Sequence, residues 1–245
     1  MTARLAAQGL ALEKRLMPTD LVVEAGALVC LIGPNGSGKT SLLHALGGIG
    51  RAAGSVRIDG QHPQRSAPDA RKRLLSFLPA SREIAWPLAA RDIIGLGLPE
   101  GGTPGLLDEA IEALDLAELL DRRIDRLSTG ERSRVLIGRA LAPRPRLALL
   151  DEPAANLDPA WQLRLMDWLK RLAASGQAVI AAMHDLDLAA RYADRLVVME
   201  KGRIAAEGEP ASLMAGDAIP RIFGVERTDA GWKLVSPSVR PRSSR

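Results

Sequence analysis

The fold of this chain is decided by the stretch Gly33-Pro-Asn-Gly-Ser-Gly-Lys39-Thr40. It follows the pattern G-x-x-x-x-G-K-[ST], in which a glycine-rich backbone cradles phosphate groups. An apolar run, Leu28–Ile32, precedes the stretch, and a segment with helical character, Ser41–Leu46, follows it. Because the pattern binds phosphates when it joins a strand to a helix, the sequence predicts a triphosphate-binding loop at this point.

The residue types in this loop suit a dense anion. Glycines let backbone N–H groups turn towards the phosphates and approach them closely, and the following helix adds its positive end. Lys39 is expected to supply a positive charge to the β- and γ-phosphates, and the Thr40 hydroxyl to bind Mg²⁺. The residues expected to contact the nucleotide here are Gly33, Pro34, Asn35, Gly36, Ser37, Gly38, Lys39, Thr40 and Ser41.

Two adjacent carboxylates form a second candidate site. The apolar run Leu147–Leu150 leads into Asp151 and Glu152, which are therefore expected at the carboxyl edge of a sheet, where open α/β sheets bind ligands. Asp151 is predicted to hold Mg²⁺, and Glu152 to deprotonate or orient the attacking water. Such a pair alone often marks a solvated turn, but beside a phosphate loop it predicts hydrolysis.

Strand-like runs alternate with helix-like segments over most of the chain, which predicts an α/β fold with a mostly parallel sheet. Between about Arg82 and Ala142 the pattern is mainly helical, with a Gly- and Pro-rich loop at Gly95–Gly105, so a helical insert is expected there. The predicted strands are Ala27–Ile32, Ser55–Ile58, Leu74–Leu78, Arg146–Leu150, Gln177–Met183 and Arg195–Glu200.

Composition excludes several classes of protein. The 245 residues carry a net charge of +4, but no basic stripe with interleaved aromatics, so a nucleic-acid partner is not expected. The single cysteine, Cys30, excludes an internal disulfide and a cysteine metal site, and its apolar run predicts burial. No apolar run reaches the length of about 18 residues that a membrane span needs. The segment from about Thr228 is expected to be a polar tail with one short strand at Trp232–Val235.

Further motifs follow in a fixed order. Leu127-Ser-Thr-Gly-Glu131 opens a helix-like segment, and Ser128 with Glu131 also fits a capping box at a helix start. Asn156-Leu-Asp158 follows the acidic pair, and His184 follows the apolar run Gln177–Met183. Together with the phosphate loop, these motifs resemble the ATP-binding-cassette (ABC) ATPases over about Leu5 to Val225.

The resemblance implies a P-loop NTPase (RecA-like) α/β core, with an antiparallel β region near the N-terminus and an inserted helical subdomain at about 81–143. The ATPase domain would span 1–225, followed by a C-terminal tail at 226–245. It also implies that His184 contacts the γ-phosphate and positions Glu152. In the family, the signature element of one subunit binds ATP held by a second copy. The residues that would do so here are Ser128, Thr129, Gly130, Glu131 and Asp158.

The chain departs from the family pattern at four positions. Thr129 replaces a glycine and Glu131 a glutamine in the signature element. Ala80 occupies the place of a glutamine that ligates Mg²⁺, so water is expected to complete the metal shell. Leu10 stands where the family often stacks an aromatic on adenine, so an apolar and weaker base contact is expected.

Within the family, Ala181–Glu200 and Ile222–Val225 resemble the importers of ferric siderophores, haem and cobalamin. This implies an ATPase that uses ATP and Mg²⁺ and works with transmembrane permease subunits, a second copy of itself and a substrate-binding protein. It would be cytoplasmic, on the inner face of the membrane. The alternatives are a cytosolic cassette without transport function and a regulatory cassette with weak hydrolysis. An ATPase assay with and without the permease separates the three.

Overall fold

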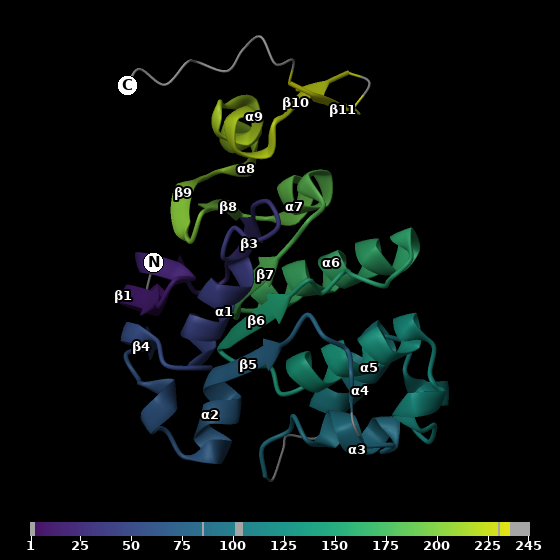
Figure 1. Ribbon diagram of the computed structural model, residues 1–245. Coiled ribbons are helices and arrows are strands. Elements are labelled where there is room, and N and C mark those ends of the chain that lie inside the picture. Colours follow the sequence, from purple (N-terminus) through teal and green to yellow (C-terminus); the bar gives the residue numbers. More distant parts are fainter. Residues whose placement is uncertain (1–2, 85, 101–104, 230, 236–245) are drawn as a thin grey trace, which may run out of the picture.

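The computed structural model describes residues 3–84, 86–100, 105–229 and 231–235, and its centre is a six-stranded sheet in the order β5-β6-β7-β3-β8-β9 (Figure 1). The first five strands are parallel and β9 is antiparallel to β8. The strands are β3 (Leu28–Ile32), β5 (Leu75–Leu78), β6 (Leu147–Asp151), β7 (Ala178–Ala182), β8 (Arg195–Glu200) and β9 (Arg203–Gly208). The predicted parallel sheet and five of the six predicted strands within it are confirmed.

A second, antiparallel sheet lies at the N-terminal side, as the resemblance implied. Its strands are β1 (Ala3–Leu12), β2 (Leu16–Glu24) and β4 (Ala53–Ile58), in the order β2-β1-β4. The predicted strand Ser55–Ile58 therefore exists but belongs to this sheet and not to the parallel one. A 3₁₀ turn (Pro63–Arg65) and α2 (Pro68–Leu74) connect β4 to β5.

The parallel strands are mainly apolar because both faces of the sheet are covered. In β3, Leu28, Cys30 and Ile32 face α6 (Pro159–Ala174) and α7 (Leu186–Tyr192), whereas Val29 and Leu31 face α1 (Lys39–Gly47) and the antiparallel sheet. Cys30 is fully buried, as predicted, and burial raises its pKa to about 12. Its thiol is therefore a core group.

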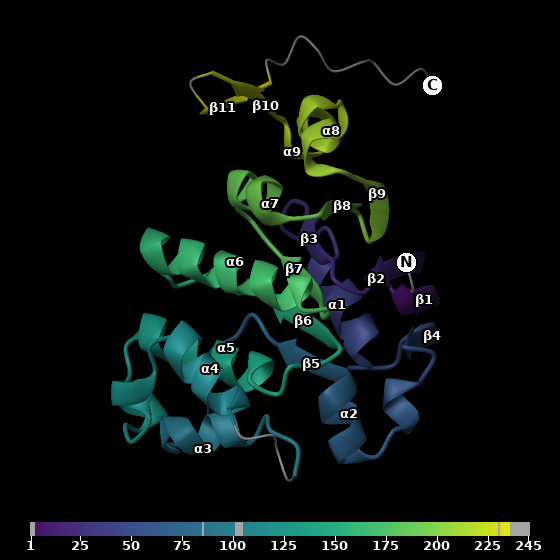
Figure 2. The same cartoon turned by 180° about the vertical axis from the view of Figure 1, so that it is seen from behind.

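The helical insert lies between β5 and β6 in sequence and beside the β5 edge in space (Figures 1 and 2). It contains α3 (Ala90–Gly95), α4 (Leu106–Ala113) and α5 (Thr129–Leu141), with 3₁₀ turns at Ala117–Leu119 and Ile124–Arg126. Within the insert, α4 ends at Ala113, and the chain continues through the two 3₁₀ turns to α5. Of the predicted loop, Gly95 closes α3 and residues 101–104 lie outside the described part. The Arg134 guanidinium of α5 lies 4.3 Å from the Trp161 ring of α6, which connects insert and core.

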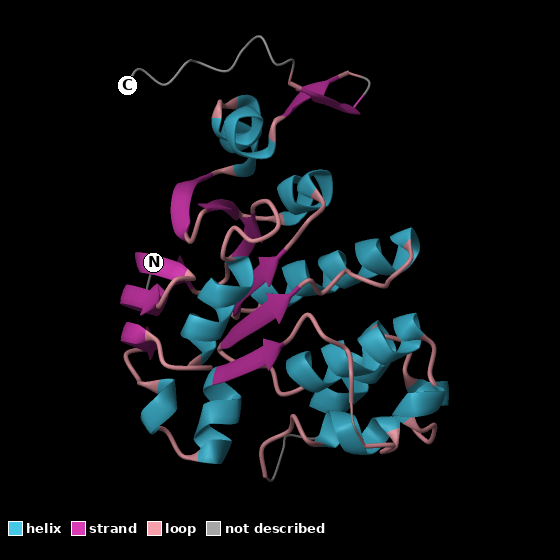
Figure 3. Cartoon of the chain, viewed as in Figure 1, coloured by secondary structure: helices cyan, strands magenta, loops and turns pink. Residues whose placement is uncertain are grey.

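The C-terminal elements pack beyond β9 (Figure 3). They are α8 (Pro210–Ala215), α9 (Ala218–Phe223) and a hairpin of β10 (Val225–Thr228) and β11 (Gly231–Leu234). The short strand predicted at Trp232–Val235 is confirmed as β11, and its Trp232 Nε1 donates a hydrogen bond to Asp187 of α7 at 2.9 Å. The rest of the predicted tail, 236–245, lies outside the described residues.

Candidate functional site

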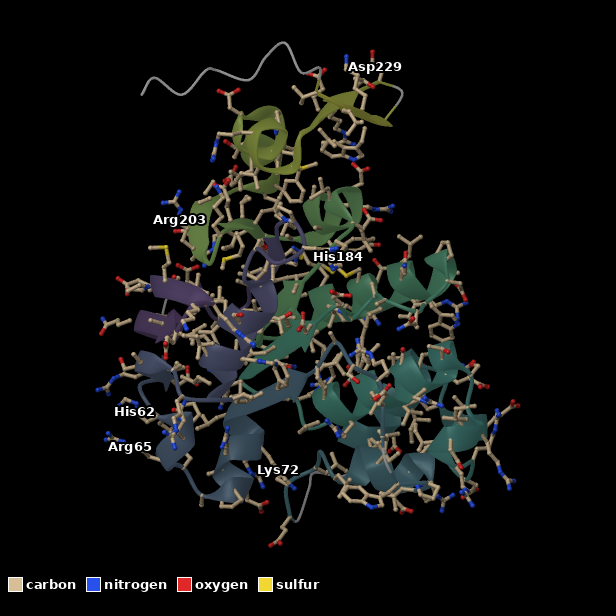
Figure 4. All side chains as sticks on the ribbon, in the orientation of Figure 1. His62, Arg65, Lys72, His184, Arg203 and Asp229 are labelled. Atoms are coloured by element: carbon tan, nitrogen blue, oxygen red, sulfur yellow. The ribbon has the colours of Figure 1, made fainter. Side chains whose placement is uncertain are left out.

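Three neighbouring strands deliver the candidate residues to one edge of the sheet. The order β6-β7-β3 places the end of β6, with Asp151 and Glu152, next to the end of β7, which leads to His184. The phosphate loop begins directly after β3. Because parallel strands end at the same edge, these segments meet there, and Figure 4 shows His184 beside α7.

The loop folds as its glycines require. A side chain at position 33 would place its Cβ 2.5 Å from the Met199 carbonyl oxygen, and Gly38 has a φ of 106°. The Lys39 ammonium donates to the Gly33 carbonyl at 2.7 Å and to the Pro34 carbonyl at 3.3 Å. Burial lowers the pKa of Lys39, against the opposing effect of Glu152 and Asp151. The loop thus forms with its cation enclosed beside two acids.

A cavity of about 680 Å³ opens over the loop, within the usual size of a small-molecule site. Glu152 and His184 line it together with the phosphate loop. The other lining residues are Lys14, Arg15, Leu16, Met17, Lys201 and Gly202.

The side of the cavity formed by Lys14–Met17, Lys201 and Gly202 was not predicted as a contact surface. It is held by two hydrogen bonds, from Met17 N to Gly202 O and from Gly202 N to Ser37 O, both 2.8 Å. Leu10, the position compared with the family's aromatic, is 2% exposed and packs in the core cluster around α1. Met17, in contrast, lines the cavity and is 54% exposed.

The two acids differ in their surroundings. Asp151 is 1% exposed, and neither of its carboxylate oxygens has a hydrogen-bond partner among the described residues. Burial raises the pKa of Asp151, and the Thr40 hydroxyl opposes that shift without a well-formed hydrogen bond. Glu152 is partly exposed, and its Oε1 lies 2.6 Å from His184 Nε2. Asp151 thus presents free oxygens from the interior, whereas Glu152 faces the cavity in contact with His184.

The signature element begins α5 with a capping box, as the sequence predicted. Ser128 Oγ accepts from Glu131 N at 3.2 Å, and Glu131 Oε2 accepts from Ser128 N at 2.8 Å. Arg122 also donates to Glu131 Oε1 at 2.9 Å. The hydrogen bonds from Ser128, and then Arg122, lower the pKa of Glu131. Glutamate in place of glutamine therefore gains an ion pair while it keeps the cap.

In the described structure, none of the signature residues lines the cavity of its own chain. Ser128 and Thr129 are exposed, and Gly130 lies near the Asn156 carbonyl. Asp158 caps α6, accepting from Trp161 N at 3.0 Å. These residues therefore form a separate surface on the same molecule.

The loop after β5 holds a residue that the sequence did not point out. Ala80 follows β5 and offers no polar side chain, but Arg82 from the same loop is 6% exposed and reaches the end of β6. Its Nη2 donates to the Glu152 carbonyl at 2.9 Å and to the Asp151 carbonyl at 3.3 Å. No sequence pattern marks this residue, because its role depends on a tertiary contact.

Comparisons with known proteins agree on one family. A profile of the ABC transporter family matches residues 16–155. The chain is 37% identical to the hemin import ATP-binding protein HmuV of Nocardia farcinica, covering 95% of this chain and 88% of that protein. It is 38% identical to the HmuV of Rhizobium meliloti, covering 89% of each.

Solved structures extend the agreement to three dimensions. The structure of an ATP-binding subunit of an ABC transporter superposes with a TM-score of 0.76 at 25% identity, covering 90% of this chain and 93% of that one. Clostridium perfringens cbiO1, part of the ABC transporter complex cbiONQ, gives a TM-score of 0.72 at 25% identity and covers 90% and 94%.

The described residues contain no helix long and apolar enough to cross a membrane. A family match over more than half of the chain, full-length relatives and the expected fold all point the same way. The chain belongs to the ATP-binding subunits of ABC transporters and is an ATPase.

Proposed function

We propose that this subunit energises a membrane importer of haem or a related metal chelate, and that two copies hold ATP between them. The observation that carries the hydrolytic part is the contact of 2.6 Å between His184 Nε2 and Glu152 Oε1 at the wall of a cavity lined by Lys39. Glu152 takes the proton of the attacking water or orients that water, and His184 keeps the carboxylate directed into the cavity. Lys39 leaves its carbonyl partners for the β- and γ-phosphates of bound ATP.

Magnesium fits the residues present. The two buried oxygens of Asp151 have no hydrogen-bond partner in the described part of the chain. They are the hard, anionic ligands that Mg²⁺ prefers, and burial of a lone carboxylate is otherwise unfavourable. Asp151 and the Thr40 hydroxyl would hold the ion, with water in the place left by Ala80. Bound Mg²⁺ would neutralise charge on the β- and γ-phosphate oxygens.

A second copy completes the site. The α5 N-terminus, with Ser128, Thr129 and Gly130, is exposed and away from the cavity of its own chain. A helix N-terminus binds anions, so in a head-to-tail dimer this end would meet the γ-phosphate held by the phosphate loop of the partner. Asp158, at the start of α6, would lie at the same junction.

The import role is supported by the relatives, which are named hemin import ATP-binding proteins and match the chain almost end to end. A permease partner is supported by exposed apolar side chains of the insert. Trp86 is 72% exposed and Leu96 60% exposed, on either side of α3. Docked to such a permease and supplied by a substrate-binding protein, the subunit would sit in the cytoplasm at the inner face of the membrane.

Reconstitution tests this function. The subunit and its permease partner are placed in vesicles, with the substrate-binding protein outside and Mg-ATP inside. We expect ATP-dependent uptake of haem, which is lost with EDTA inside or with Lys39→Ala. Equal ATPase activity with and without the permease, and no uptake, would contradict the transport role.

A further inference from the structure

Arg82 is a buried cation in a loop that otherwise runs over the surface. Its side chain is 6% exposed, whereas Glu83 is exposed and Trp86, further along the loop, is 72% exposed. Burying a guanidinium is costly unless it is paired. The loop therefore buries this side chain despite the cost of desolvating its charge. We expect a specific contact that offsets this cost.

The contact is with the backbone that carries the two acids. Arg82 Nη2 donates to the carbonyl oxygens of both Asp151 and Glu152. Glu152 has a φ of 52°, a left-handed conformation that residues other than glycine rarely adopt. A donor on both carbonyls of this turn holds the peptide that sets the direction of the Glu152 side chain.

Charge adds to this effect. Burial lowers the pKa of Arg82, and the neighbouring Asp151 and Glu152 act against that shift. An arginine keeps its charge even so, and its attraction to the two carboxylates strengthens in a poorly solvated site. Its Nε and Nη1 are buried and have no partner within residues 3–84, 86–100, 105–229 and 231–235. The guanidinium is thus committed to this turn and to nothing else in the described structure.

We propose that Arg82 is a positioning residue for hydrolysis, which fixes the Asp151–Glu152 turn so that the Glu152 carboxylate stays against His184. It acts through the backbone and from the loop in which Ala80 offers no side-chain ligand. The inference rests on the role proposed above for Glu152. It requires that loss of the guanidinium slows turnover while ATP binding at the phosphate loop is kept.

Steady-state ATPase kinetics of the full-length chain test the proposal with Arg82→Met, which keeps the length of the side chain and removes its donors. We expect kcat to fall by about tenfold or more, because loss of a residue that orients a functional side chain typically costs that much activity. The KM for ATP should stay within about twofold of the wild-type value. The matched control is Arg4→Met. Arg4 is also largely enclosed and donates to a backbone carbonyl, that of Gly176, which precedes β7 at the edge of the sheet opposite the cavity. We expect its kcat to be unchanged.

Arg82→Lys supplies the conservative rescue and replaces the methionine variant if the latter does not fold. Its ammonium can still reach one carbonyl, so its kcat should lie between those of wild type and Arg82→Met. The inference is overturned if the kcat of Arg82→Met equals that of wild type. It is also overturned if Arg4→Met loses as much kcat and both losses follow a fall in melting temperature. Glu152→Gln in the same assay separates the two proposals. If Glu152→Gln hydrolyses ATP at the wild-type rate, the role proposed for Glu152 is wrong. If Glu152→Gln is inactive but Arg82→Met has the wild-type kcat, only the inference about Arg82 is wrong.

Discussion

The side chains proposed for the chemistry come from three points of the backbone, and each is held differently. Lys39 lies enclosed against the Gly33 carbonyl, Asp151 is buried with free oxygens, and Glu152 is paired with His184. The proposed cation, metal ligand and base therefore each have surroundings of their own. Their separate surroundings make it possible to remove them one at a time.

Replacing the proposed base stalls the reaction after binding. In Glu152→Gln the amide keeps the shape of the side chain but cannot accept a proton, so we expect hydrolysis to fall by about 100-fold or more. ATP should still bind, because the phosphate loop is intact. Phosphate release and nucleotide retention on a desalting column measure both effects. Glu118→Gln, an exposed change in the helical insert, is the control, and equal turnover in the two variants would contradict the assignment.

Removing the phosphate-loop cation weakens binding instead. Lys39→Ala deletes the ammonium, and loss of a charged hydrogen bond of about 1.5–3 kcal/mol corresponds to about a 10- to 100-fold rise in the Kd for Mg-ATP. A fluorescent ATP analogue reports this change. Lys233→Ala, in the C-terminal hairpin, should bind as wild type does. An unchanged Kd in the first variant would show that Lys39 does not contact the phosphates.

The sequence predicts candidate site residues well when they are contiguous in the chain. Gly33–Thr40 was recognisable because its role depends on local backbone geometry, and the structure places it as expected. Arg82 and the wall at Lys14–Met17 were missed because their contacts, with Glu152 and with Gly202, join segments far apart in the chain. Tertiary contacts of this kind leave no periodicity or motif.

At the scale of elements, the start of α5 has two tasks. Its capping box satisfies backbone groups of the helix, and the same residues form the exposed end proposed to face the partner's ATP. Stability and activity are therefore coupled at Ser128. The pKa of Glu131 is lowered in the folded state, so the stabilisation from its bonds is present above its usual pKa and is lost as the pH falls through the lowered value.

Ser128→Ala removes the side-chain acceptor for the Glu131 amide. We expect the free energy of unfolding to fall by about 1 kcal/mol at neutral pH, measured by urea denaturation. Glu131→Gln keeps both cap bonds and weakens only the ion pair with Arg122, so its loss should stay below about 1 kcal/mol. A larger loss in Glu131→Gln than in Ser128→Ala would contradict this description of the cap.

The exposed apolar side chains of the helical insert are the proposed permease contact. Trp86→Ser removes its most exposed aromatic side chain and should reduce co-purification with the permease from detergent extracts several-fold, since buried aromatics dominate interface energies. Leu234→Ser is the matched control, because Leu234 is 79% exposed but lies in β11, at the other end of the molecule. Equal recovery of the two variants would place the permease contact elsewhere.

The sequence predicted the buried strands better than the strands with exposed polar residues. The parallel strands are mainly apolar and buried, and five of the six predicted strands are present in that sheet. Strands β1 and β2 were not identified individually because Gln8 and Gly9 in β1, and Pro18 and Asp20 in β2, are exposed and interrupt the pattern. In the insert, Leu116 and Leu119 continue the helical spacing of α4 but lie in a turn, because Asp115 adopts a φ of 48°.

At the scale of the whole molecule, the two proposed halves of the nucleotide site lie apart on one chain. The phosphate loop, Glu152 and His184 line one cavity, whereas Ser128 and Asp158 lie outside it. The fold explains this, since α5 belongs to the insert and starts far from the end of β3. The phosphate-loop half was predicted from its own residues, whereas the signature half and the union of both halves across two copies were implied by the family resemblance.

Mixing two inactive variants tests most directly whether each ATP site is formed by two copies of the chain. Lys39→Ala chains lose the phosphate contact, and Ser128→Arg chains block the signature surface. If each ATP lies between two copies, a mixed dimer retains one intact pair, Lys39 of the second variant with Ser128 of the first. We expect that each variant alone neither occludes nor hydrolyses Mg-ATP, and that the mixture recovers occlusion of one ATP per mixed dimer. A mixture as inactive as its components, with mixed dimers shown to form, would contradict this expectation.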